Sequence, residues 1–354
     1  MQFGVLLHAS KQMSGFDLEE MTMRQTLNVV ITGASAGLGR AIAHEFGKTG
    51  ARVGLISRDL PALEATADEI GKLGGLAVTY AADVSDDQAV EAAAASFEER
   101  LGPIDVWVNN AMVSVFSPIK EMEAAEFRRV TEVNYLGYVH GTLAALRRML
   151  PRNRGRIIQV GSALAVRSIP LQSAYCATKH AIVGFTDSLR CEIYHDKSAV
   201  KAVVVHMPAM NTPQFTWVKS RLPNLPQPVP PIYEPEVGAK VIVHAAFTSS
   251  PRREYWVGGS TVKAIVGQKL FPGLLDLYLG KTGYKAQQRE ESDYPDRPNN
   301  VWHPVSTTLG AHGPFDTKSR PFSIEAEVSK HRGWFVFGCG LLGAALCARK
   351  LLSR

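Results

Sequence analysis

Short apolar runs alternate with longer amphipathic stretches from residue 27 to about residue 260. Apolar runs of roughly four to eight residues predict buried strands, and the stretches between them have the apolar spacing of helices. This alternation is typical of βαβ units, and it predicts an α/β fold with a doubly wound, Rossmann-like parallel sheet of about seven strands. The predicted strands are LNVVIT, RVGLIS, LAVTYAA, IDVWVNN, RIIQVGS, KAVVVHM and EYWVG, and the predicted helices cover residues 38–49, 60–73, 86–100, 124–150, 173–194 and 235–248.

Two segments break this rhythm. The connection after the sixth strand contains five prolines between residues 223 and 231, and long connections beside the carboxyl ends of strands are where α/β proteins place substrate walls. The polar, charged segment that follows residue 284 indicates a linker or an extended wrap. We therefore divide the chain into an N-terminal extension (1–26), one domain (27–284), this segment (285–330) and a hydrophobic C-terminal segment (331–354). Met21 and Met23 directly precede the first strand, and a translation start there is one hypothesis for the extension.

The C-terminal segment holds sixteen residues without a charge, GWFVFGCGLLGAALCA at 333–348, between basic flanks. A helix of that length measures about 24 Å, slightly less than the roughly 30 Å of a bilayer's hydrocarbon core. Snorkelling of the basic flanks makes up part of the difference. We expect a membrane anchor with the domain on the cytoplasmic side; the alternative is a buried or oligomer-forming helix in a cytoplasmic protein.

Composition and charge exclude some partners. The 354 residues carry a formal net charge of +6, but no run of lysines and arginines is interleaved with aromatic residues. We therefore expect no nucleic-acid partner. The four cysteines show neither a C-x-x-C spacing nor a partnering histidine spacing, so we expect no metal site.

A glycine-rich turn, TGASAGLG, follows the first strand and opens the first helix. Glycines at such a junction let the backbone turn tightly and approach a pyrophosphate, which the helix N-terminus then stabilises. A purely structural turn is the alternative. The candidate cofactor contacts in this turn are Gly33, Ser35, Gly37, Leu38 and Gly39.

The motif T-G-x-x-x-G-x-G at the start of such a chain resembles the short-chain dehydrogenase/reductase family. The end of the second strand, LISRD, then bears on the choice of dinucleotide. Ser57 stands where an NAD site usually has its carboxylate, and Arg58 has the planar fork that suits the 2′-phosphate of NADP. Asp59 offers a competing hydrogen bond to a ribose, but it lies one position too late for the family's pattern. We expect NADP(H).

The resemblance also assigns roles to polar residues farther along the chain. Asp83 and Asn109 match family positions that hold the adenine and stabilise the central sheet; the alternatives are a helix N-cap and a turn residue. Thr212, in PAMNTP, matches a threonine that contacts the carboxamide of the nicotinamide. The chain departs from the family at Met112 and Ala209, where the family has glycine, which affects the local loops rather than the fold.

Four residues form the candidate catalytic set. Tyr175 and Lys179 are separated by one helical turn, so they share a helix face. A neighbouring ammonium favours the phenolate, so we expect the pKa of Tyr175 to be lowered. Ser162 ends the fifth strand, and Asn134 lies in the long helix before it. The resemblance implies that Ser162 holds the substrate oxygen and that Asn134 holds a water near the lysine; a loop cap and a solvated helix residue are the alternatives.

These residues predict an NADP(H)-dependent oxidoreductase that interconverts a carbonyl and an alcohol. The alternatives are a non-catalytic NADPH-sensing or scaffolding protein, and an epimerase or dehydratase. Phe215 and Trp217, with the prolines beside them, form an apolar substrate wall or belong to the core. With a membrane anchor, a lipophilic substrate is favoured. The family resemblance further implies a homodimer or homotetramer formed through the two long helices.

Overall fold

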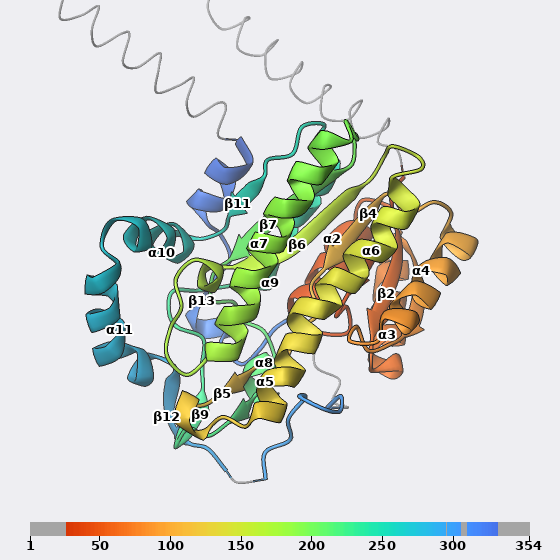
Figure 1. The fold of residues 1–354 in the computed structure, drawn as a ribbon. Coiled ribbons are helices and arrows are strands. Elements are labelled where there is room, and N and C mark those ends of the chain that lie inside the picture. Colours follow the sequence, from red (N-terminus) through yellow and green to blue (C-terminus); the bar gives the residue numbers. More distant parts are fainter. Residues whose placement is uncertain (1–25, 295, 306–309, 332–354) are drawn as a thin grey trace, which may run out of the picture.

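The computed structural model describes residues 26–294, 296–305 and 310–331. Its centre is a seven-stranded sheet, and all of the neighbouring strands in it pair in parallel (Figure 1). The sheet has the order β3–β2–β1–β4–β6–β7–β11, which confirms the predicted doubly wound fold. Its strands are β1 (Asn28–Thr32), β2 (Arg52–Ser57), β3 (Leu76–Ala81), β4 (Val106–Asn109), β6 (Arg156–Ser162), β7 (Lys201–Met207) and β11 (Glu254–Trp256).

Helices cover both faces of this sheet, which is why the central strands are apolar on both sides. One core cluster joins one face to α2 (Gly37–Gly47), α3 (Leu60–Lys72) and α9 (Pro235–Phe247). The second cluster joins the other face to α4 (Asp87–Leu101), α6 (Gly137–Met149) and α7 (Ser173–His195). Strand order reverses between β1 and β4, and in such sheets ligands bind at the carboxyl ends beside that point.

The predicted long helix over residues 124–150 consists of three pieces in the structure. It begins as α5 (Ala124–Thr131), continues as a π-helix over Glu132–Leu136, and ends as α6. Short π-helical turns within α-helices are frequent at functional sites. This one contains Asn134, one of the four candidate catalytic residues.

The proline-rich connection forms short elements that pair with other parts of the chain. It contains α8 (Gln214–Trp217), β8 (Lys219–Ser220), β9 (Asn224–Pro226) and β10 (Ile232–Tyr233), and β8 pairs with β5 (Val115–Phe116). Two further helices, α10 (Gly259–Leu270) and α11 (Pro272–Ala286), follow the sheet and lie beyond its β11 edge (Figure 1).

The segment after α11 lies against the domain. It contributes β12 (Gln288–Ser292), which pairs with β9, and β13 (Ser319–Arg320), which pairs with β10. Val301, Phe315 and Ala326 are buried in it. Of the two interpretations of residues 285–330, a linker and an extended wrap, the described residues form the wrap. We call the described part of residues 287–331 the C-terminal wrap.

Within residues 26–331, as far as they are described, no helix has the length and apolar character needed to cross a membrane. The predicted anchor at 333–348 lies outside the described residues, so it stays a prediction.

Candidate active site

A cavity of about 810 Å³ opens at the carboxyl ends of the strands, beside the point where strand order reverses. Ligand pockets commonly measure about 300–1,000 Å³. Eleven of the thirteen predicted site residues line it: Gly33, Ser35, Gly37, Leu38, Gly39, Arg58, Asp83, Ser162, Tyr175, Lys179 and Thr212. The structure therefore brings together residues that are far apart in the sequence.

The glycine-rich turn has a backbone that only glycine permits at two positions. Gly33 has a φ of +68°, and a Cβ atom on it would lie 2.7 Å from the Cα of Ala111. A Cβ on Gly39 would lie 1.9 Å from the carbonyl oxygen of Gly33. Helix α2 begins at Gly37 without a side-chain cap, and its first residues, Gly37, Leu38 and Gly39, line the cavity, so the positive end of the helix dipole lies beside it. This end of the cavity is suited to a phosphate.

The end of β2 separates the two candidate contacts for the adenosine ribose. Asp59 caps α3, because its Oδ1 accepts a hydrogen bond from the amide of Ala62 at 3.2 Å. Arg58 also lines the cavity, with a side chain that is 20% exposed, and burial lowers the pKa of its guanidinium. Both residues therefore border the cavity, but one oxygen of the Asp59 carboxylate is engaged in the α3 cap.

Asp83 lies 4.0 Å from Arg58 and is held by a second arginine. Arg129 forms an ion pair with it, and the hydroxyl of Ser85 donates a hydrogen bond at 2.8 Å. Burial alone would raise the pKa of the Asp83 carboxyl, but the Arg129 and Ser85 hydrogen bonds outweigh it and the pKa is lowered. This carboxylate is ionised at neutral pH.

Asn109 does not line the cavity; its neighbour Asn110 does. The Asn109 side chain is fully buried and joins β4 to α6 and β6. Its amide nitrogen donates to Gln159 Oε1 at 2.9 Å and to Thr142 Oγ1 at 3.2 Å, and its oxygen accepts from Trp107 Nε1 at 2.8 Å. Of the two roles that the resemblance implied, the geometry places Asn109 in the sheet and away from a bound adenine.

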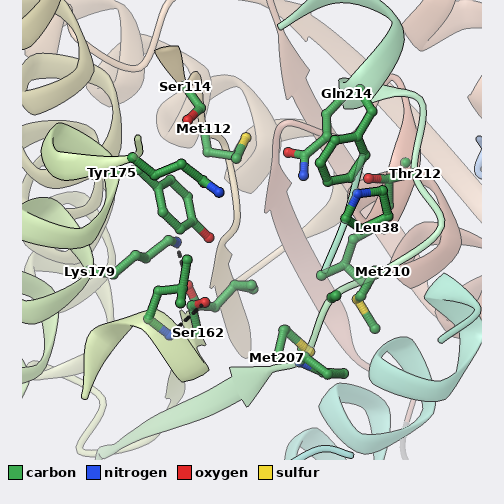
Figure 2. A pocket seen from close by; sticks show the side chains of 18 of the residues that line it. Leu38, Met112, Ser114, Ser162, Tyr175, Lys179, Met207, Met210, Thr212 and Gln214 are labelled. Carbon is green, nitrogen blue, oxygen red and sulfur yellow. Dashed lines mark hydrogen bonds between the residues drawn. The ribbon is translucent and has the colours of Figure 1, made fainter. Parts of the chain in front are cut away.

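Tyr175 and Ser162 face each other at the carboxyl end of β6, and Lys179 lies one helical turn after Tyr175 on α7 (Figure 2). The Ser162 hydroxyl lies close enough to Tyr175 to lower the pKa of its phenol, and Ser162 Oγ accepts a hydrogen bond from the amide of Leu164 at 3.1 Å. Lys179 is buried, with its Nζ atom 5.6 Å from the centre of the Tyr175 ring. Two hydroxyls and one amine thus meet at one end of the cavity.

The expected lowering of the Tyr175 pKa is wrong. Burial raises the pKa of Tyr175 to about 12, and the Ser162 hydrogen bond lowers it only in part. The Lys179 ammonium is directed elsewhere: it donates to the Val160 carbonyl at 2.7 Å and to the Tyr138 hydroxyl at 3.0 Å. Burial lowers the pKa of Lys179 to about 7, which weakens the positive charge near the phenol.

Asn134 does not line the cavity with its side chain. Its oxygen accepts from the amide of Val113 at 2.8 Å, and its nitrogen donates to the Val113 carbonyl at 2.9 Å. The side chain therefore fixes the loop after β4 to the π-helix. It also lies 3.5 Å from the Thr178 hydroxyl, next to Lys179 in the sequence.

Several residues at the site are not predicted from the sequence. Tyr138 lies one helical turn after Asn134, and this spacing is the only signal that could have found it. Ser114 lines the cavity with a buried hydroxyl that has no hydrogen-bond partner among the described residues. Gln214 also lines the cavity, and Arg129 forms the ion pair that holds Asp83. No motif marks these last three.

The rest of the cavity is largely apolar. Phe215 is buried against Phe116 and Phe315, and it lines the cavity together with Trp217, so it belongs both to a core cluster and to the wall. Methionines extend this surface (Figure 2). Other apolar lining residues come from the proline-rich connection and α11: Pro228, Val229, Pro230, Pro231, Leu275 and Leu279.

A dinucleotide fits these features. The α2 N-terminus, the Arg58 guanidinium and the unpartnered Ser114 hydroxyl all border one continuous cavity. A model of the short chain dehydrogenase family matches residues 27–221. The chain belongs to the short-chain dehydrogenase/reductase family. Its members are oxidoreductases, and the site residues described above lie within or next to the matched region.

Named relatives agree with this membership. The chain is 32% identical over 269 residues to an uncharacterised oxidoreductase, YxnA, of Bacillus subtilis, which covers 75% of each chain. It is 38% identical to dehydrogenase/reductase SDR family member 7B of Mus musculus, over 50% of this chain and 55% of that protein. It is 32% identical to 3-dehydrosphinganine reductase of Danio rerio, over 63% of this chain and 70% of that protein.

Solved structures of the family resemble the domain. An alcohol dehydrogenase from Thermococcus sibiricus, complexed with 5-hydroxy-NADP, has a TM-score of 0.58 at 25% identity and covers 66% of this chain and 96% of its own. A metagenomic short-chain oxidoreductase in complex with NADP has a TM-score of 0.56 at 31% identity, over 65% of this chain and 96% of its own.

Proposed function

We propose that this family member is an NADP(H)-dependent oxidoreductase that interconverts a carbonyl and an alcohol on an apolar substrate. One observation carries the proposal: Tyr175 and Ser162 line one end of the cavity whose other end is the N-terminus of α2. Binding of a dinucleotide alone requires no buried pair of hydroxyls at the far end. The pair is what a proton transfer to an oxygen requires.

The cofactor supplies or accepts a hydride at the substrate carbon when it is bound. The chain's own residues donate a proton and a hydrogen bond to the substrate oxygen. Because its pKa is raised, Tyr175 is protonated at neutral pH and donates its proton to a carbonyl oxygen that becomes an alcohol. Ser162 donates a second hydrogen bond to that oxygen. Lys179 would hold the nicotinamide ribose, and the π-helical turn that contains Asn134 would position a water near Lys179 for a proton relay.

Arg58 supports the choice of NADP(H). It is the cation at the end of β2, and Asp59, the competing carboxylate, is already engaged in capping α3. A guanidinium has a planar fork that matches a phosphate. The two structural neighbours named above were solved with NADP or a derivative of it, which supports the same choice.

The apolar wall supports a lipophilic substrate. Leu275 and Leu279 of α11 line the cavity, while Leu274 and Leu277 of the same helix are more than 60% exposed. An apolar substrate therefore meets apolar surface on both sides of α11. With the predicted anchor at 333–348, the protein would act at a membrane surface with its domain in the cytoplasm. The name of the Danio rerio relative makes 3-dehydrosphinganine one reasonable test substrate.

The test is oxidation of NADPH by the full chain against apolar and polar carbonyls, run beside Tyr175→Phe. We expect turnover of apolar carbonyls and a loss of kcat on the order of 10²–10⁴-fold in the variant, because the proton donor is removed. Tyr135→Phe is the matched control, since Tyr135 contacts Phe185 on α7 away from the cavity lining. NADPH binding without turnover, unchanged in Tyr175→Phe, would instead indicate an NADPH sensor.

We also propose that the protein forms a homodimer or homotetramer through α6 and α7. Leu143 on α6 is 42% exposed, and so is available for such a contact. Light scattering of the full chain in detergent tests this assembly. A monomer at every protein concentration would contradict it.

A further inference from the structure

Two stretches of the C-terminal wrap lie at the proposed cofactor site, and neither belongs to the matched family region; Arg320 and Glu325 of the wrap line the cavity elsewhere. Asn300, Pro304 and Val305 line the cavity near the ends of β2 and β3. Farther along, Gly310 reaches the N-terminus of α2, where its carbonyl accepts a hydrogen bond from the amide of Gly37 at 3.1 Å. The family match ends at residue 221, so these contacts are made by a part of the chain outside it.

The first contact holds the guanidinium of Arg58. Its Nη2 atom donates to the carbonyl of Asn300 at 2.6 Å, and its Nη1 atom donates to the carbonyl of Trp302 at 3.1 Å. A guanidinium has five N–H donors in a fixed plane. These two carbonyls, together with the Val301 carbonyl 3.5 Å from Nη1, fix that plane and leave donors for a phosphate.

Residues 300–302 also contact the side chains that surround Arg58. The Val301 side chain is fully buried in the second core cluster, and its carbonyl accepts from Arg129 Nε at 3.0 Å. Arg129 in turn pairs with Asp83, which lies 4.0 Å from Arg58. The side chain of Val301 thus anchors a backbone that arranges both arginines and the carboxylate between them.

The second contact seats the wrap beside the phosphate end of the cavity. A Cβ atom on Gly313 would lie 2.4 Å from the Thr212 carbonyl oxygen, so the wrap passes close against the loop after β7. The amide of Phe315 donates to Asn211 Oδ1 at 3.0 Å, and Phe315 packs on Phe215. The wrap is therefore fixed at both ends of the proposed cofactor site.

We propose that the wrap determines cofactor preference, with the carbonyls of Asn300 and Trp302 acting as positioning groups that hold Arg58 ready for the 2′-phosphate of NADP(H). This inference rests on the proposed function. An arginine side chain that is free loses rotamer entropy when it is ordered. Since the wrap orders Arg58 when the chain folds, binding of the cofactor reduces the rotamer entropy of Arg58 by less. This strengthens the binding only of a cofactor that contacts Arg58, which is one with a 2′-phosphate.

The experiment measures dissociation constants for NADPH and NADH by titration calorimetry, so it does not depend on turnover. Val301→Ala loosens the anchor without touching the cavity lining. We expect its Kd for NADPH to rise about tenfold, which corresponds to about 1.4 kcal/mol, while its Kd for NADH changes by less than about threefold. Trp302→Ala, at a residue that is 46% exposed, is the second variant, and the same selective loss is expected. Phe322→Ala, in an exposed part of the wrap, is the matched control and leaves both constants unchanged.

A double-mutant cycle shows whether the wrap acts through Arg58. Arg58→Gln lowers NADPH affinity selectively, and adding Val301→Ala to it is expected to cost nothing more. Equal losses for NADPH and NADH, or additive losses in the double variant, would show a merely structural wrap and overturn the proposal. Tighter NADPH binding in Val301→Ala would overturn it as well, because the carbonyls would then compete with the phosphate. A wild-type protein that prefers NADH would contradict the proposed cofactor itself, before any variant is compared.

Discussion

Lys179 donates a hydrogen bond from Nζ to the hydroxyl of Tyr138 at 3.0 Å, while the same atom lies 5.6 Å from the ring centre of Tyr175. The Tyr138 hydroxyl in turn donates to the Val160 carbonyl at 3.1 Å, so three polar groups form a closed and buried set. The candidate catalytic lysine is therefore held by a tyrosine on α6 and not by the tyrosine of its own helix.

We expect Tyr138→Phe to change the pH dependence more than the stability. The variant removes an acceptor from the buried ammonium, which disfavours the charged form and lowers the already depressed pKa of Lys179 further. If the charged lysine is needed, the upper limb of the kcat/KM profile moves to lower pH. Tyr135→Phe on the neighbouring turn is the control. A profile that is unchanged in Tyr138→Phe would show that Tyr138 only fills space.

The order of elements could be predicted because apolar periodicity reports it directly. Each predicted strand of the sheet corresponds to an observed one, from β1 to β11. The cluster of Ser162, Tyr175 and Lys179 could also be predicted, since the carboxyl ends of parallel strands meet at one edge. These features depend on local pattern and on the general geometry of the fold.

Other features depend on contacts that no local pattern encodes. The carbonyl partners of Arg58 lie 242 and 244 positions farther along the chain. Backbone carbonyls are present at every residue, so no residue type marks these two. The sequence predicts a lowered pKa for Tyr175, and the pKa is raised, because contacts distant in the sequence decide this too. Helical spacing gives the shared face with Lys179, but burial and the other partners of the ammonium decide the sign.

The raised pKa of Tyr175 leads to a direct spectroscopic prediction for the cofactor-free protein. Because burial raises that pKa to about 12, Tyr175 stays neutral while exposed tyrosines ionise near pH 10. Tyrosinate absorbance of wild type and Tyr175→Phe should therefore coincide up to about pH 10.5 and separate only above it. An extra ionisation in the wild type below pH 10 would mean that the Lys179 ammonium dominates after all.

Asn109→Leu is expected to lower stability and to leave cofactor affinity nearly unchanged. The variant strips partners from the buried Trp107, Thr142 and Gln159 side chains, and each unsatisfied group costs about 1–3 kcal/mol. Denaturant unfolding should show this loss, whereas the Kd for NADPH at permissive temperature should stay within about threefold, because Asn109 does not line the cavity. A selective loss of NADPH affinity in a stably folded variant would return Asn109 to the cofactor site.

Lys179→Met is expected to abolish turnover and to raise the thermal midpoint of unfolding. Burial lowers the pKa of Lys179 to about 7, whereas the unfolded chain keeps the ordinary value near 10.4. Between these two values the unfolded state binds more protons, so wild-type stability rises with pH. The methionine variant carries no such group, and its advantage should be largest below pH 7 and shrink as the pH rises toward 10. Lys240→Met is the control for the loss of one lysine, because Lys240 is exposed on α9 and does not line the cavity. A methionine advantage that stays constant with pH would mean that Lys179 titrates alike in both states and that its burial carries no cost in the charged form.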